Sequence, residues 1–276
     1  MADAARIENP EIDHLVLDVG DRIDQAEAAY RLLGFNLSPR GRHSLGSENH
    51  VAALRGPYLE LLGLGSAGRS RPELAGSPIG LNGIVLASQS PSSTFEALRA
   101  LGIRAQQPTA LSRPVDPRRT ARFSVVRLEA DQTDFGRVYF CHHETPELIW
   151  NDDSLAHPNG AIAIVRARIA TNDARKATQF LMRIFGENIL QRDSSCWRLR
   201  FGAVDLDFVP PREAEWWATA EGRDDYIAVL TMLTSSLRQT AEVLRSNGIT
   251  GVIFEAERIV VPATVAFNLA LEFVQA

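Results

Sequence analysis

Four segments of this 276-residue chain share one order of sequence patterns. Each begins with an apolar, strand-like stretch, passes a polar capping residue into a short amphipathic helix, and ends that helix at a glycine. A repeat of this length constrains the fold strongly, because every copy must form the same supersecondary unit. The strand-like stretches are IDHLVLDV (12–19), LNGIVLAS (81–88), AIAIVRARIA (161–170) and YIAVLTML (226–233). The capping residues are Asp24, Ser93, Asp173 and Ser236, and the glycines are Gly34, Gly102, Gly186 and Gly248.

The text after each helix predicts further strands. HVAALRG and YLELLGL follow the first helix, and RFSVVRLEA and RVYFCHH follow the second. The unit is therefore β-α-β-β, with one extra strand in some copies, and the fold class is α+β. A doubly wound α/β sheet is the alternative, but it would place one strand rather than two after each helix. Since a single unit exposes one face of its sheet, we expect the four units to pair into two half-open mixed sheets.

The best candidate for a boundary between the two pairs is NDDSLAHPNG (151–160), a polar stretch with a Pro-Asn-Gly turn signal. We therefore expect a first domain over residues 8–155 and a second over residues 160–276. All six histidines lie at or before position 157, so any histidine-dependent chemistry belongs to the first part of the chain; they are His14, His43, His50, His142, His143 and His157.

Composition narrows the class of protein. The chain is 45% apolar and 23% charged with a formal net charge of −5, which is typical of a soluble globular protein and disfavours a nucleic-acid partner. It has no apolar run near the roughly 18 residues that span a membrane, and no signal-peptide core at its start. Its two cysteines, Cys141 and Cys196, are far apart, which favours a reducing, cytoplasmic location. We expect a monomer or homodimer acting on a small molecule.

Strand alternation points to a buried polar pair in the first unit. In IDHLVLDV, one face of the strand carries Leu15, Leu17 and Val19 and forms a surface for the helix. His14 points to the other, concave face with Ile12 and Val16. In YLELLGL, Glu60 shares a face with apolar neighbours, where an unpaired carboxylate would cost several kcal/mol. A metal ion would remove that penalty. A hydrogen-bonded core histidine and a glutamate paired with an arginine remain the simpler alternatives.

The second unit adds further candidates. Asn82 occupies the position that we equate with His14, and RVYFCHH offers His142 and His143 on opposite faces of one strand. Two imidazoles and a carboxylate with open positions suit a divalent first-row metal.

Two loops could complete a binding site. Arg113 lies in an arginine-rich segment that two X-Pro steps make stiff, and it could bind a carboxylate or phosphate. The segment GRHSLGSENH supplies His43, Asn49 and His50, which could line the mouth of the site. Solvated surface loops are the alternative for both segments.

These residues resemble the vicinal oxygen chelate superfamily, which includes glyoxalase I, extradiol dioxygenases and bleomycin-resistance proteins. The paired units carry the general resemblance. The stretches SRPVDPRRTARFSVVRL (112–128), HHETPELIW (142–150) and HPNGA (157–161) resemble, more narrowly, its glyoxalase-like domain proteins. The resemblance covers residues 10–161, and the rest of the chain shares only the repeat.

The resemblance implies metal ligands on the first and last strands of each unit. Those positions give His14, Glu60 and His143 as ligands, with Glu60 or His143 also moving a proton. Asn82 departs from the family pattern, because a histidine is commoner there. The cofactor would be a divalent ion: zinc, iron, manganese, nickel or magnesium. In the second half Asp207 and Glu272 take the carboxylate positions without a histidine, which predicts a degenerate, structural copy.

The resulting hypothesis is a metal-dependent lyase, isomerase or dioxygenase acting on a small oxygenated, anionic substrate. Arg113 would hold the anionic end of that substrate. A metal-free binding or resistance protein of the same fold, and a scaffold without chemistry, are the alternatives. The other expected substrate contacts are Asn82, His50, Asn49 and His142.

Overall fold

The structure is a computed structural model that describes residues 6–44, 46–65, 74, 76–192, 196–214 and 225–276. These residues form four βαββ-type units, which confirms the predicted α+β class. The first unit consists of β1 (Ile12–Gly20), α1 (Ile23–Leu32), β2 (Gly41–Arg42), β3 (Ser47–Ala52) and β4 (Tyr58–Leu64). The second consists of β5 (Gly80–Ala87), α3 (Pro91–Ala100), β6 (Thr109–Pro114), β7 (Thr120–Arg127) and β8 (Arg137–His143).

The second half repeats this order. Its third unit consists of β9 (Ala161–Ala170), α4 (Ala174–Phe185), β10 (Leu190–Arg192), β11 (Trp197–Phe201) and β12 (Val204–Val209). The short α5 (Pro211–Ala214) precedes the fourth, which consists of β13 (Tyr226–Thr234), α6 (Leu237–Ser246), β14 (Ile253–Phe254), β15 (Arg258–Val261) and β16 (Ala270–Gln275). Short 3-10 turns cover Ala130–Gln132, Pro146–Leu148, Glu187–Ile189 and Ala263–Val265.

Local sequence sets where the helices begin. Asp173 and Ser236 cap α4 and α6 as predicted, each accepting a hydrogen bond from a backbone N–H three residues later. The cap of α3 is Ser90 rather than Ser93, because Pro91 fits the first turn of a helix and the helix therefore begins earlier than predicted. In α1 the residue Asp24 lies inside the first turn instead of capping it.

The two units of each half join through their first strands. In the first half β1 pairs antiparallel with β5, and each of these strands pairs in parallel with the last strand of its own unit, β4 or β8. The strand order is β2-β3-β4-β1-β5-β8-β7-β6, and the second half repeats it around β9 and β13. A single pair, Ile227 with Leu81, links the starts of the central strands β13 and β5 and joins the halves.

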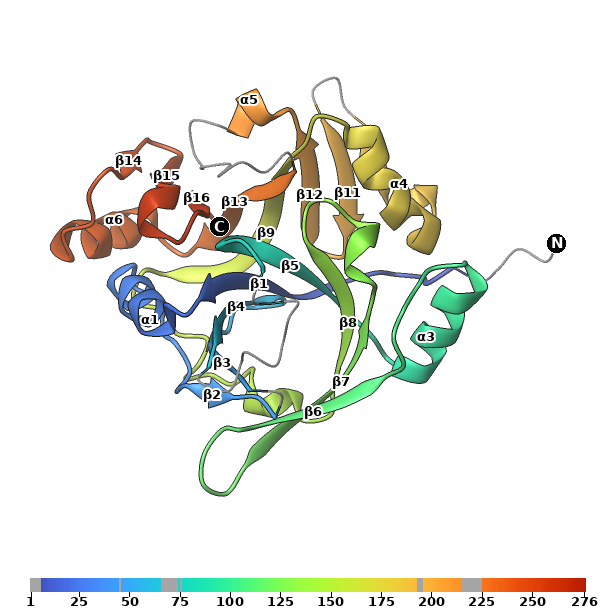
Figure 1. The fold of residues 1–276 in the computed structure, drawn as a ribbon. Helices are drawn as coiled ribbons and strands as arrows, with labels where there is room; N and C mark the ends of the chain where they lie inside the picture. Colours follow the sequence, from blue (N-terminus) through green and yellow to red (C-terminus); the bar gives the residue numbers. More distant parts are fainter. Residues whose placement is uncertain (1–5, 45, 66–73, 75, 193–195, 215–224) are drawn as a thin grey trace.

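Helices from the two halves pack against each other and close one shared core. Figure 1 shows α1 beside α6 at the left and α3 below α4 at the right. Asn247 after α6 donates to the Leu32 carbonyl at 2.7 Å, and Arg183 of α4 donates to the Leu101 carbonyl at 3.2 Å. The buried helix faces and the convex faces of both sheets form a single hydrophobic cluster. Each concave face carries its own smaller cluster.

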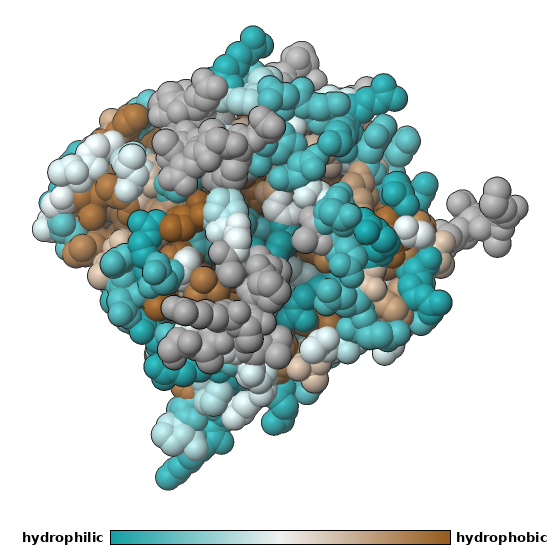
Figure 2. Space-filling model, viewed as in Figure 1, coloured by the Kyte–Doolittle hydropathy of each residue, from teal (hydrophilic) through white to brown (hydrophobic). Residues whose placement is uncertain are grey.

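The outer surface is mixed in polarity. Figure 2 shows hydrophobic side chains gathered at the left, over the region of α6 and β14, where Ile253 and Phe254 are exposed. In the described part of the chain, no helix has the length and apolar character needed to cross a membrane.

A pair of β-bulges interrupts the alternation of the two central strands. Ile12 pairs with Leu86 and His14 with Val85, which leaves Asp13 as an extra residue on β1. Such a residue puts two successive side chains on one face. Ile12 therefore joins the helix-side core, not the concave face on which alternation predicted it.

Candidate functional site

The concave face of the first half encloses a cavity of about 860 Å³, a size that suits a small molecule. Strands β1, β3, β4, β6, β7 and β8 all contribute to its wall. One part is polar and contains His14, His43, Asn49, Glu60, Arg113 and Tyr139. Apolar side chains also line the cavity and include Val51, Leu62, Leu111, Phe123 and Val125.

His14 and Glu60 face each other across two neighbouring parallel strands. The strands β1 and β4 pair in the register Val16 to Glu60, and both polar side chains are buried. His14 Nε2 lies 3.7 Å from Glu60 Oε2. Because metal–ligand bonds are about 2.0–2.2 Å long, one ion between these two atoms could contact both.

Each member of this pair is held by a neighbour. Tyr58 stacks on the His14 ring at 4.4 Å between centroids. Asn49 Nδ2 donates to Glu60 Oε1 at 2.5 Å, and His43 Nε2 lies 3.8 Å from that same oxygen. The Tyr139 hydroxyl lies 3.5 Å from His14 Nε2, at the outer limit of a hydrogen bond.

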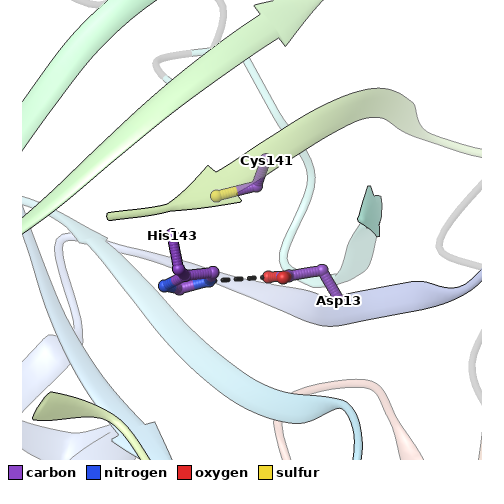
Figure 3. A group of neighbouring side chains, drawn as sticks. All are labelled: Asp13, Cys141 and His143. Carbon is purple, nitrogen blue, oxygen red and sulfur yellow. Dashed lines mark hydrogen bonds and ion pairs between the residues drawn. The ribbon is translucent and has the colours of Figure 1, made fainter. Parts of the chain in front are cut away.

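Asp13 determines how His14 is presented to the cavity. The bulge turns Asp13 to the concave side, where its Oδ1 accepts from His14 Nδ1 at 2.5 Å and from His143 Nε2 at 3.0 Å. Figure 3 shows Asp13 and His143 pointing toward one another from β1 and β8. Burial alone would raise the pKa of Asp13, but the hydrogen bonds from the two histidines outweigh it and lower the pKa to about 2.

A charged Asp13 fixes the chemistry of the neighbouring atoms. An ionised carboxylate only accepts hydrogen bonds, so His14 must carry a proton on Nδ1. In neutral His14 the lone pair of Nε2 then faces the Glu60 carboxylate, and two acceptors repel unless a cation lies between them. That cation is either a proton shared between the two groups or a metal ion. A metal-binding histidine usually donates its other ring N–H to such a carboxylate, so the arrangement fits a metal ligand.

Arg113 is a buried cation in the same cavity. Its side chain is 3% exposed, and among the described residues no carboxylate lies within 4.0 Å of it and its Nε has no hydrogen-bond partner. Burial lowers the pKa of Arg113, which the nearby Tyr58 and Glu60 oppose. Gly41 makes room for it, because a Cβ there would collide with the Arg113 side chain and with Asn49. An unpaired buried guanidinium is poised to bind an anion.

Two histidines that we expected in the site face the other way. His50 lies on the helix side of β3, where its Nε2 is 3.0 Å from Glu27 Oε2, because alternation gives the cavity to Asn49 and Val51. His142 lies on the helix side of β8, with Nδ1 2.9 Å from the Ser88 carbonyl. Neither residue lines the cavity, which corrects both predictions.

Asn82 also lies outside the cavity lining. It is the bulge residue of β5, since Val16 pairs with Gly83 and Leu17 with Leu81. Its structural counterpart is therefore Asp13, and Gly83 takes the position equivalent to His14. The Asn82 amide donates to Asp18 Oδ2 at 3.3 Å and to the Pro78 carbonyl. This corrects the expected substrate contact.

His143 reaches the site only through Asp13. It shares the concave face of β8 with Tyr139, as alternation indicated, but it does not line the cavity. The register of β5 and β8 pairs Val85 with Tyr139, just as β1 and β4 pair Val16 with Glu60. Tyr139, which our sequence reasoning missed, therefore occupies the position equivalent to Glu60. The structure thus places His143 behind Asp13 and outside the cavity lining, where we had expected a ligand and a base beside Glu60.

Asp13, His143 and Cys141 form a second group of potential ligands. Their ligand atoms all lie within 4.8 Å of one another (Figure 3). However, Asp13 Oδ1 already accepts from two imidazoles, and burial raises the pKa of the Cys141 thiol well above its usual value. The pair His14 and Glu60 is the better candidate for a site that meets a substrate, because both of its groups line the cavity, whereas Asp13 and His143 do not.

Arginines neutralise the carboxylates on the concave face of the second half. Asp207 accepts from Arg198 at 2.5 and 2.8 Å and lies 3.3 Å from Arg166. Glu272 lies 3.3 Å from both Arg168 and Arg258. Each of these two carboxylates is therefore paired with two arginines, and the structural role of the second copy stays a prediction.

The paired βαββ units and the polar cavity inside the first sheet define the vicinal oxygen chelate fold. Residues 12–185 match the profile of the glyoxalase-like domain family, and the chain belongs to that family. No curated protein matches the sequence.

Solved structures share the fold at low sequence identity. A hypothetical protein from Staphylococcus aureus has a TM-score of 0.70 at 10% identity, over 97% of this chain and 100% of that one. A mutant 4-hydroxymandelate synthase from Streptomyces coelicolor has a TM-score of 0.62 at 12% identity, over 98% and 93%. The Mn(II)-bound glyoxalase from Novosphingobium aromaticivorans has a TM-score of 0.58 at 11% identity, over 96% and 81%.

Proposed function

We propose that the chain is a divalent-metal-dependent enzyme acting on a small anionic molecule that carries two neighbouring oxygens. One observation carries the proposal: His14 Nε2 and Glu60 Oε2 face each other at 3.7 Å inside the cavity. Asp13 holds the imidazole and Asn49 holds the carboxylate, so both groups are oriented before any ion arrives.

His14 Nε2 and Glu60 Oε2 would hold the ion, with the Tyr139 hydroxyl beside them. When bound, a divalent ion withdraws electron density from substrate oxygens and stabilises negative charge on them. The choice among zinc, iron, manganese, nickel and magnesium stays open. Support for manganese comes only from the fold relative described as a Mn(II)-bound glyoxalase.

The rest of the cavity defines the class of substrate. Arg113 would bind a carboxylate or phosphate, since its buried Nε has no hydrogen-bond partner and no carboxylate lies within 4.0 Å of it among the described residues. Leu111, Phe123 and Val125 offer an apolar wall for the body of the molecule. The substrate is then an anion with an apolar part and two adjacent oxygens.

His43 is the best-placed group for moving a proton. Its Nδ1 lies 2.9 Å from Ser47 Oγ, and its Nε2 reaches the cavity next to Glu60. Because Glu60 and His43 can both carry protons beside the substrate oxygens, we favour a lyase or isomerase reaction over a dioxygenase reaction.

The metal content of protein purified without chelators tests this function. We expect about one divalent ion per wild-type chain, and a loss of that ion in His14→Ala and Glu60→Ala. His142→Ala is the matched control, because His142 faces the opposite side of the sheet. Wild-type protein with no more metal than His14→Ala would contradict the proposal.

A metal-free binding protein is the second candidate. It is favoured by Gly83 and Tyr139, which occupy the second unit's equivalents of His14 and Glu60 and supply neither an imidazole nor a carboxylate. In that case a small anion would bind with the same affinity before and after treatment with a chelator. The cytoplasmic location and the monomeric or homodimeric state stay predictions.

A further inference from the structure

One carboxylate oxygen links two histidines from different units. Asp13 Oδ1 lies 2.5 Å from His14 Nδ1 on the same strand and 3.0 Å from His143 Nε2 on β8. The link exists only because the bulge in β1 turns Asp13 to the concave side. Without the bulge, Asp13 and His14 would point to opposite faces of the sheet.

We propose that His143 is a positioning residue that acts on His14 through Asp13. His143 holds the Asp13 carboxylate in place, and Asp13 keeps the proton of His14 on Nδ1, so the lone pair of Nε2 faces Glu60. The effect on metal affinity rests on the proposed metal site. The effect on the His14 tautomer does not.

The surroundings of His143 suit this role. Its ring packs edge-on against Phe123 at 5.1 Å and Trp150 at 5.0 Å between centroids, which fixes its orientation. Among the described residues its buried Nδ1 has no hydrogen-bond partner, so Asp13 is the polar contact that its ring makes there. His143 does not line the cavity and contacts no proposed ligand atom of the ion.

The arrangement also explains why Asp13 needs a second anchor. A carboxylate that contacts only the next residue along the chain can rotate away from it, whereas a carboxylate held from β8 cannot do so without losing a charged hydrogen bond. Carboxylates behind metal-binding histidines typically change metal affinity by 10- to 100-fold when they are removed.

The test compares His143→Phe with His142→Phe, the neighbouring histidine on the opposite face. Phenylalanine keeps the edge contacts with Phe123 and Trp150 but cannot donate to Asp13. Nitrogen-15 NMR of histidine-labelled, metal-free protein reports the His14 tautomer, and competition with a chelating dye reports Mn²⁺ affinity. The His14 signal is assigned from its loss in His14→Ala.

In His143→Phe we expect a smaller fraction of the Nδ1–H tautomer of His14 and roughly tenfold weaker Mn²⁺ binding. Asp13→Ala should have a larger effect. His143→Gln should restore part of both readouts, because the glutamine amide can donate to Asp13. His142→Phe should match the wild-type protein.

The proposal is wrong if His143→Phe keeps the wild-type tautomer, or if His142→Phe changes the tautomer equally. If His143→Phe does not fold, His143→Gln against Asp13→Ala gives the same comparison. Wild-type protein that binds none of the five candidate ions, Mn²⁺ included, but still shows the Asp13-dependent tautomer would refute the proposed function and leave this inference standing.

Discussion

Replacing Arg113 with methionine should move the stability of the protein and its affinity for anions in opposite directions. Arg113 is 3% exposed and has no ion-pair partner within 4.0 Å among the described residues. Burying an ion costs several kcal/mol even after the protein relaxes. Methionine has a similar length, no charge and a flexible apolar side chain that can fill the same space.

The cost of burying the Arg113 charge sets the expected changes in stability and in anion affinity. Because the cavity admits water, we take only part of the penalty and expect Arg113→Met to raise the free energy of unfolding by about 1–3 kcal/mol. At about 2 °C per kcal/mol for a chain of this size, the Tm should rise by about 2–6 °C. Loss of a buried charged contact should weaken anion binding by about 2–4 kcal/mol, which is about 30- to 1000-fold.

Thermal unfolding and calorimetric titration with phenylpyruvate, a 2-oxo carboxylate with an apolar body, measure the two effects. Arg122→Met is the matched control, since Arg122 is exposed and lies 3.7 Å from Glu144 at the surface. We expect the control to change stability by less than about 0.5 kcal/mol. An Arg113→Met protein that is less stable than wild type and binds phenylpyruvate equally well would refute this reasoning.

Three further predictions concern the same cavity. Gly41→Ala should lower stability by about 1–3 kcal/mol in urea unfolding and weaken phenylpyruvate binding, because its Cβ would displace Arg113 and Asn49. Gly76→Ala is the matched control for crowding, because Gly76 has open space around its Cβ and, like Gly41, no positive φ. The pKa of Asp13 is about 2 in the folded protein, below its ordinary value of 3.8. Ionised Asp13 therefore adds about 2 kcal/mol to the free energy of unfolding above pH 3.8, and this stabilisation is lost as the pH falls through 2. Asp13→Ala should flatten the dependence of stability on pH between these two values, and an unchanged slope would contradict the prediction. Tyr139→Phe should weaken Mn²⁺ binding severalfold without changing phenylpyruvate binding to metal-free protein, and an unchanged Mn²⁺ affinity would remove Tyr139 from the site.

Much of the fold could be predicted because the signals are local. The glycine stops and the pairs of strands after each helix recur in every unit, so errors at one copy are corrected by the others. The predicted caps at Asp173 and Ser236 are present in two of the units. Alternation also placed Glu60 on the concave face and His142 and His143 on opposite faces of β8, as in the structure.

The errors at Ile12 and Asn82 share one physical cause. A β-bulge shifts the alternation by one residue, and nothing in IDHLVLDV marks it. The bulge on β1 moved Ile12 into the helix-side core and brought Asp13 to His14, while its counterpart on β5 made Asn82 equivalent to Asp13 instead of His14. Tyr139 could have been found, because it alternates with Cys141 and His143 in RVYFCHH.

The burial of Arg113 depends on a contact that no local pattern encodes. Its strand lies in an arginine-rich segment that looks solvated, and only the missing side chain of Gly41, far away in the sequence, leaves room for the guanidinium. Positions of this kind need the assembled sheet to be recognised.

Anomalous X-ray scattering from crystals soaked in MnCl₂ tests the central claim most directly. The account predicts an ion bound to both His14 Nε2 and Glu60 Oε2, about 2.0–2.2 Å from each, with no peak in crystals of Glu60→Ala. An ion found instead among Asp13, Cys141 and His143, or no ion in the cavity of the wild-type protein, would contradict it.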